Sequence, residues 1–150
     1  MTTLTQLSAT LRHAVELRRN KGVSCVIISG GDVLCFERRG IADLHILLHT
    51  HPEILHSCVI ADKVVGKGAA ALMVAGGVAE VFSEVMSRPA AELLEEHNIK
   101  YGCDTLVDNI INRTQTGLCP VESICCELHT IGEMVESIDS FVAKPHDNNN

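Results

Sequence analysis

Aromatic and basic side chains are scarce in this sequence, and long apolar segments are absent. Only 3% of the 150 residues are aromatic while 46% are hydrophobic, so the core is expected to be aliphatic. The formal net charge of −7 leaves too few clustered cations to neutralise phosphates, which argues against duplex nucleic acid as a partner. No uninterrupted apolar run approaches the roughly 18 residues of a membrane-spanning helix, so no membrane partner is expected.

Two features of secreted proteins are also missing. The first residues have neither the basic start nor the apolar run of a secretory signal. The seven cysteines are odd in number and irregularly spaced, which is typical of free thiols in a reducing compartment and not of a disulfide framework. We therefore expect a cytoplasmic protein without a cofactor, and we leave open whether it forms a homo-oligomer.

Local patterns predict one domain over residues 1–144 and a disordered tail at 145–150. Leucines at helical spacing predict a first helix, and two apolar runs around Gly30-Gly31-Asp32 predict a hairpin. The order of helices and strands predicts an α/β fold, a three-layer α/β/α sandwich with a mixed sheet. The predicted helices are 3–20, a short one within 41–55, 62–76, 87–96, 120–128 and 130–142, and the predicted strands are 23–29, 33–37, 78–85 and 99–103.

Three segments resemble a bacterial family known as domain of unknown function 1893: Ala61-Asp62-Lys63-Val64-Val65-Gly66-Lys67, Asn112-Arg113 and Gly117-Leu118-Cys119-Pro120-Val121-Glu122. The resemblance covers roughly residues 23 to 140. It implies a cytidine-deaminase-like fold, in which two helix N-termini point at one pocket, but it implies no activity.

The zinc motifs of deaminases are not found where the resemblance would place them. Zinc deaminases carry H-x-E at the start of one helix and P-C-x-x-C at the start of the next. Those places correspond here to Asp62-Lys63-Val64 and Ser87-Arg88-Pro89-Ala90-Ala91, which contain no zinc ligand of that set and no glutamate. We therefore expect neither bound zinc nor zinc-dependent deamination at this pocket.

Two lysines in the opening turns of the helix predicted from residue 62 indicate an anion site. A cation near a helix N-terminus costs about 0.3–1 kcal/mol, whereas the free N–H groups there attract anions. Lys63 and Lys67 would share one helical face, and Asn112 and Arg113 could join them. We hypothesise a small anionic ligand, nucleotide-like or phosphorylated, bound by these residues and Asp62. In the alternative, Asp62 caps the helix and both lysines extend into solvent.

Catalytic candidates are Cys119 and Glu122. Cys119 precedes a proline at a helix start, a position that lowers the pKa of a thiol and favours a nucleophile, and Glu122 could act as its base. In the structural alternative, Cys119 is the helix N-cap and Glu122 the reciprocal capping residue. Whether the protein is an enzyme stays open.

Histidines clustered after the hairpin provide an alternative function, a metal-dependent enzyme. His45 and His49 have the i, i+4 spacing of metal-binding pairs, and His51 lies close by in the sequence. Asp43 or Glu53 could complete the site. The glutamate of H-E-x-x-H is missing, so this alternative ranks below the ligand site. A protein-interaction module without a ligand is the third hypothesis.

Overall fold

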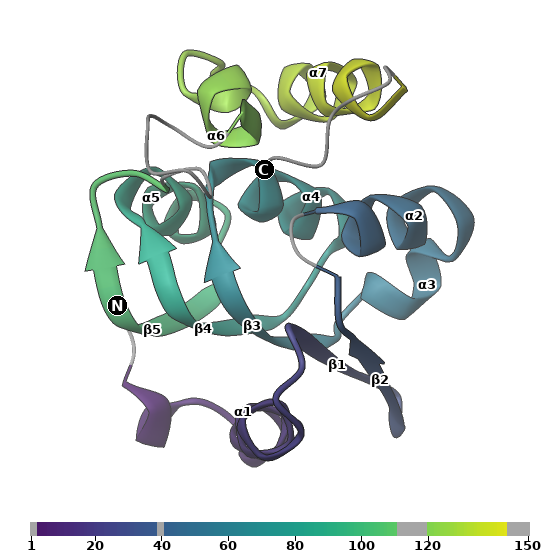
Figure 1. Cartoon of the computed structure of the whole chain (residues 1–150), viewed down its shortest axis with the longest axis vertical. Coiled ribbons are helices and arrows are strands. Elements are labelled where there is room, and N and C mark those ends of the chain that lie inside the picture. The colour runs from purple at the N-terminus through teal and green to yellow at the C-terminus, as the bar shows by residue number, and fades with distance from the viewer. Residues whose placement is uncertain (1–2, 39–40, 111–119, 144–150) are drawn as a thin grey trace.

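Helices and strands alternate along the chain in the computed structural model, which describes residues 3–38, 41–110 and 120–143 (Figure 1). The strands are β1 (Cys25–Ser29), β2 (Asp32–Phe36), β3 (Val59–Val65), β4 (Glu80–Ser87) and β5 (Lys100–Val107). The helices are the 3-10 helix η1 (Leu4–Gln6), then α1 (Ala9–Lys21), α2 (Ala42–Thr50), α3 (Pro52–Leu55), α4 (Lys67–Gly76), α5 (Arg88–Glu96), α6 (Pro120–Cys125) and α7 (Ile131–Ala143). Within the described ranges, no helix has the length and apolar character needed to cross a membrane.

The five strands form one mixed sheet in the order β2-β1-β3-β4-β5. The predicted hairpin is confirmed: β1 and β2 pair antiparallel around Gly30 and Gly31, whose φ angles of 56° and 94° favour glycine. β1 also pairs antiparallel with β3, whereas β3, β4 and β5 are parallel. Helices α4 and α5 make the crossovers between these parallel strands, so both helices begin at the carboxyl ends of the parallel strands.

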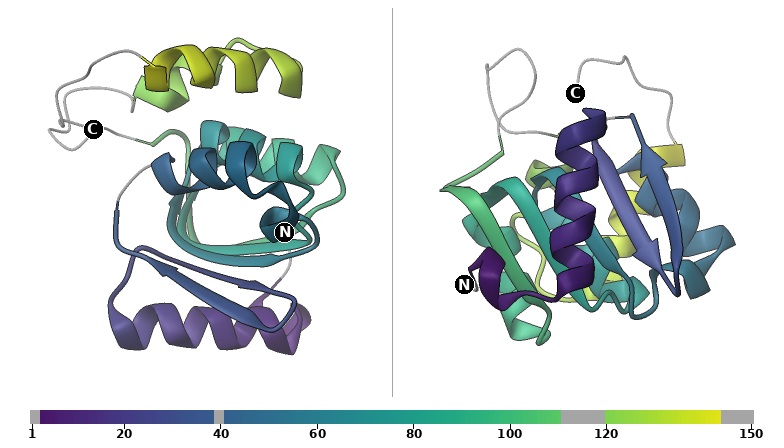
Figure 2. Two further views of the ribbon diagram at one scale, coloured as in Figure 1. Left: turned by 90° about the vertical axis from the view of Figure 1, so that its right-hand side faces the viewer. Right: turned by 90° about the horizontal axis from the view of Figure 1, so that it is seen from below.

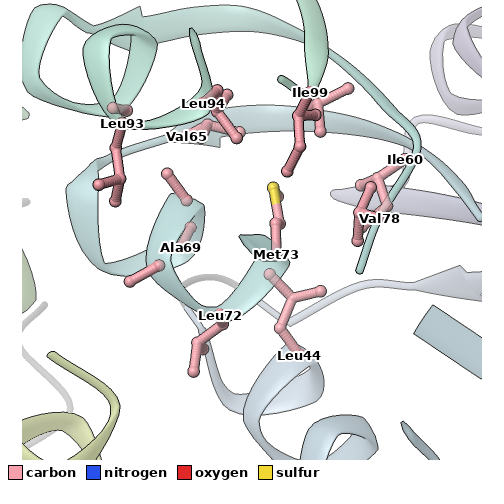
Figure 3. Close-up of a cluster of buried hydrophobic side chains, with 14 of the residues drawn as sticks. Leu44, Ile60, Val65, Ala69, Leu72, Met73, Val78, Leu93, Leu94 and Ile99 are labelled. Carbon is pink, nitrogen blue, oxygen red and sulfur yellow. The ribbon is translucent and has the colours of Figure 1, made fainter. Parts of the chain in front are cut away.

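Helices cover both faces of the sheet (Figure 2). Helix α1 packs on one face, where Leu11 and Val15 meet Val26 and Phe82. Helices α2, α4 and α5 cover the other face around a larger core (Figure 3), and α6 and α7 lie farther out, packed on α4 and on each other. The fold is therefore a mixed α/β fold. On the face covered by α2, α4 and α5, the helices α6 and α7 lie over this expected helical layer.

The helix predicted over residues 62–76 is wrong in its first part. Residues 59–65 form strand β3, and the helix begins only at Lys67, after Gly66 in an extended conformation. Strand β3 lies between β1 and β4 and bonds to both, and this pairing outweighs the local preference for a helix. Asp62 and Lys63 consequently lie in a strand and not at a helix N-terminus.

Several other predicted boundaries hold. Helix α5 begins after Ser87, whose hydroxyl accepts a hydrogen bond from the N–H of Ala90 at 3.2 Å. Thr130 likewise accepts from the N–H of Glu133 at 3.2 Å at the start of α7. The predicted helix over 3–20 is divided into η1 and α1, and the predicted tail at 145–150 lies outside the described residues.

Candidate functional site

The N-terminus of α4, where an anion was expected, holds the chain's own carboxylate. Glu122 on α6 is 2% exposed. Its Oε1 accepts hydrogen bonds from the backbone N–H of Lys67 at 3.1 Å and from the hydroxyl of Ser87 at 2.9 Å, and its Oε2 accepts from the N–H of Ile110 at 3.1 Å. Because Ser87 also caps α5, one carboxylate connects both helix starts. Glu122 thus provides the negative charge that a helix N-terminus favours.

The two lysines of the predicted anion site lie on different elements. The ammonium of Lys67 donates to the carbonyls of Leu128 at 3.0 Å and Cys126 at 3.3 Å, which follow α6. Lys63 is an exposed residue of β3. Their predicted pairing on one helical face is therefore wrong, because Lys63 belongs to the strand and Lys67 to the helix.

Three of the predicted site residues, Asn112, Arg113 and Cys119, lie outside the described residues. Their roles in ligand binding or catalysis therefore stay predictions. Glu122, the suggested base for Cys119, has its carboxylate engaged with α4 and α5.

A row of polar and thiol side chains crosses the sheet on the face that α4 covers. Asp62 is the register partner of Cys25 on β1 and of Ser83 on β4, and Ser83 is the partner of Cys103 on β5. Cys25 and Cys103 pack with the core beneath α4, so Asp62 and Ser83 lie between them on the same face. Ser83 is 0% exposed, and its hydroxyl has no hydrogen-bond partner within the described part of the chain.

Burial in this row raises the pKa of two titratable groups, Asp62 and Cys25. Burial raises the pKa of Asp62 to about 7, although the backbone N–H groups of Lys63 and Val64 and the charge of Arg18 oppose the shift. The N–H of Lys63 donates to Asp62 Oδ1 at 2.7 Å. Burial, together with the nearby Asp62, holds the pKa of the Cys25 thiol well above its ordinary value. Asp62 can therefore exist in either protonation state near neutral pH.

Asp62 and Ser87 do not begin the two helices that the deaminase-like resemblance implies. The helix after the hairpin is α2, which begins at Ala42, and the helix after the third strand is α4, which begins at Lys67. The predicted positions at Asp62 and Ser87 precede α4 and α5, one helix later than the resemblance requires, because residues 59–65 form strand β3. Neither Ile41-Ala42-Asp43-Leu44 nor Gly66-Lys67-Gly68-Ala69-Ala70 contains H-x-E or P-C-x-x-C.

The histidine cluster has a different third member from the one predicted. His45 and His49 on α2 converge on Asp139 of α7, whereas His51 contacts Glu53 through its Nδ1 at 3.2 Å. The hydrogen bond from His45 is the main cause that lowers the pKa of Asp139. Asp139 lies 94 residues after His45, so no local spacing in the sequence could have identified it.

A known family matches the chain over most of its length. The family described as "Domain of unknown function (DUF1893)" matches residues 13–142. A solved structure of a DUF1893 family protein (TM1506) from Thermotoga maritima has a TM-score of 0.81 and 21% sequence identity, and the match covers 90% of this chain and 92% of that one. At this identity the likeness shows the fold alone. No curated protein matches the chain. From the extent of the family match, we conclude that the chain belongs to the DUF1893 family.

Proposed function

We propose that this domain binds a small, uncharged polar molecule, such as a nucleobase, nucleoside or carboxamide, at Asp62 and Ser83. The observation that carries the proposal is the Ser83 hydroxyl, which is buried without a partner among the described residues. Leaving a buried hydroxyl unsatisfied costs about 1–3 kcal/mol, and such groups in native proteins call for an explanation. A ligand that exchanges hydrogen bonds with Ser83 would remove this cost.

The chemistry of Asp62 supports the same place. A carboxyl group that changes protonation near neutral pH can accept or donate a hydrogen bond, and a hydroxyl can also do both. Together they match a ligand edge with an adjacent donor and acceptor, as nucleobases and carboxamides present. Asp62 is partly exposed, whereas Ser83 is fully buried.

An uncharged ligand agrees with the local charges better than the anion expected from the sequence. Lys67 is bonded to backbone carbonyls, and Glu122 already occupies the start of α4. Arg18 donates to Glu84 and to the carbonyl of Val23. A phosphate near Asp62 would therefore meet a carboxyl group, and the cations Lys67 and Arg18 are already engaged.

The arrangement of the sheet supports a cytidine-deaminase-like fold as the frame for this site. An antiparallel hairpin precedes three parallel strands, and α4 and α5 begin at the carboxyl ends of these strands. Ligands of open α/β sheets bind outside the carboxyl ends of the strands. Asp62 lies three residues before the end of β3 at Val65, and Ser83 lies four residues before the end of β4 at Ser87. Superposition of an experimental structure on zinc deaminases tests this assignment.

The ligand proposal is tested by thermal shift and calorimetry with nucleobases, nucleosides and carboxamides, compared with nucleoside monophosphates and inorganic phosphate. A ligand at 100 times its Kd stabilises the fold by about 2.7 kcal/mol, which corresponds to a rise in melting temperature of roughly 5–10 °C for a chain of this size. The variants Ser83→Ala and Asp62→Ala should each weaken binding about tenfold, the effect of one lost hydrogen bond.

Matched controls are Ser140→Ala and Asp32→Ala, which remove an exposed hydroxyl and an exposed carboxyl elsewhere on the surface. Both control variants should bind as the wild type does. If no uncharged compound shifts the melting temperature, or if Ser83→Ala binds as tightly as Ser140→Ala, the proposal fails. A protein-interaction module without a small ligand then becomes the better hypothesis.

A further inference from the structure

We propose that His45, His49 and Asp139 form a binding site for a divalent transition-metal ion. These three residues offer one ligand atom each, and the three atoms all lie within 4.8 Å of one another. The proposal does not depend on the ligand proposed for Asp62 and Ser83, because the two sites share no residue.

Two helices bring the three side chains together. His45 and His49 are one turn apart on α2, so their imidazoles project from the same side of that helix. Asp139 comes from α7, which lies over the helical layer that contains α2 (Figure 2). Its Oδ1 is 2.8 Å from Nε2 of His45 and 2.7 Å from Nε2 of His49. Both imidazoles therefore point their Nε2 atoms at one carboxylate oxygen.

The spacing of these atoms suits a metal ion after rotation of side chains. Bonds from Zn²⁺ to imidazole nitrogen and carboxylate oxygen are about 2.0–2.2 Å, so tetrahedral ligand atoms lie roughly 3.3–3.5 Å apart. The carboxylate oxygen would have to move away from each Nε2 by about 0.5–0.8 Å, and the most separated ligand atoms, within 4.8 Å of each other, would have to approach by up to roughly 1.5 Å. The side chains of Asp139 and His49 are 42% and 46% exposed, so rotation of these two side chains can bring the ligand atoms together.

The donor set selects the kind of metal. Two imidazoles and one carboxylate suit Zn²⁺, Co²⁺, Ni²⁺, Mn²⁺ or Fe²⁺, whereas Mg²⁺ and Ca²⁺ prefer oxygen ligands alone. The side chain of His45 is 15% exposed and that of His49 is 46% exposed, so the cluster opens to solvent on one side. Three protein ligands leave further coordination positions for water or another molecule, unlike structural zinc sites, which have four protein ligands.

A simple hydrogen-bonded cluster is the competing explanation. A carboxylate that accepts from two partly exposed histidines forms a surface hydrogen-bonded cluster of small energetic value, which would need no metal. The two explanations differ in whether the affinity for metal depends on all three residues. A metal site loses affinity when any ligand is removed, whereas scattered surface histidines bind metal weakly and independently.

The first test is a calorimetric titration of chelator-treated, tag-free protein with ZnCl₂. The second is a titration with CoCl₂, in which the visible absorption bands of bound Co²⁺ are measured. We expect one ion per chain, intense absorption bands that indicate Co²⁺ of low coordination number, and a higher melting temperature of the protein with metal bound. His49→Ala and Asp139→Asn should each weaken binding at least tenfold. His51→Ala is the matched control, because His51 lies two residues after His49 but contacts Glu53, and it should bind as the wild type does.

His49 is the preferred position for the test because its side chain is the most exposed of the three, so its removal should leave the fold intact. Circular dichroism and the melting temperature of the metal-free variant check this directly. If the folded His49→Ala variant binds Zn²⁺ as tightly as His51→Ala, or if the wild type binds no ion at micromolar concentration, the proposed metal site is refuted.

Discussion

Replacement of Glu122 tests whether one buried carboxylate holds the α6–α7 pair to the rest of the domain. In Glu122→Ala, the N–H groups of Lys67 and Ile110 and the hydroxyl of Ser87 lose their common acceptor. Each unsatisfied donor costs about 1–3 kcal/mol, and the start of α4 loses an anion worth roughly 0.3–1 kcal/mol. Recovery of the cost of burying the carboxylate offsets part of this loss. We expect Glu122→Ala to lower the free energy of unfolding by about 3–5 kcal/mol.

The variant Glu122→Gln removes the negative charge but keeps the size and shape of the side chain. The glutamine oxygen can still accept from Lys67 and Ser87, but its amide group would face the N–H of Ile110, donor against donor. This variant should lose about 1–3 kcal/mol. Urea denaturation followed by circular dichroism measures both losses as shifts in midpoint at a constant m value. Glu136→Ala, which removes an exposed glutamate from α7, should change stability by less than about 0.5 kcal/mol. A loss below about 1 kcal/mol in Glu122→Ala would show that the carboxylate does not anchor α6.

Two further predictions concern Asp62 and the glycines of α4 and α7. Because the pKa of Asp62 is raised to about 7 in the folded state, from about 3.9 when unfolded, protonated Asp62 contributes stability that is complete below about pH 4 and is lost as the pH rises through 7. Wild-type stability should therefore fall relative to Asp62→Asn by about 2–4 kcal/mol between pH 4 and 8, and parallel urea midpoints across this range would contradict the shift. Gly68→Ala should destabilise by about 1–3 kcal/mol, because its Cβ would lie 2.1 Å from Cγ1 of Val121. Gly132→Ala, with open space around its Cβ, should instead stabilise by up to about 1 kcal/mol, and equal melting temperatures of the two variants would refute this packing argument.

The elements that were predicted well depend on residues close together in the sequence. The Gly30-Gly31 turn, the Ser87 cap and the Thr130 cap each act within a few residues, so a local pattern is enough to identify them. Strand β3 was missed because its pairing partners are far away in the chain. An apolar run followed by lysines and alanines is compatible with a helix until β1 and β4 are placed on either side of it.

The sequence by itself determined the mixed α/β character of the chain, the hairpin, the start of α5 and the pair of histidines in the candidate metal site. Only the tertiary structure decided which side chains meet. Glu122 reaches Lys67 across 55 residues of sequence, and Asp139 reaches His49 across 90. Such contacts depend on how α6 and α7 pack over α4. That packing arises from burial of apolar surface, which is non-directional and specifies no polar partner in advance.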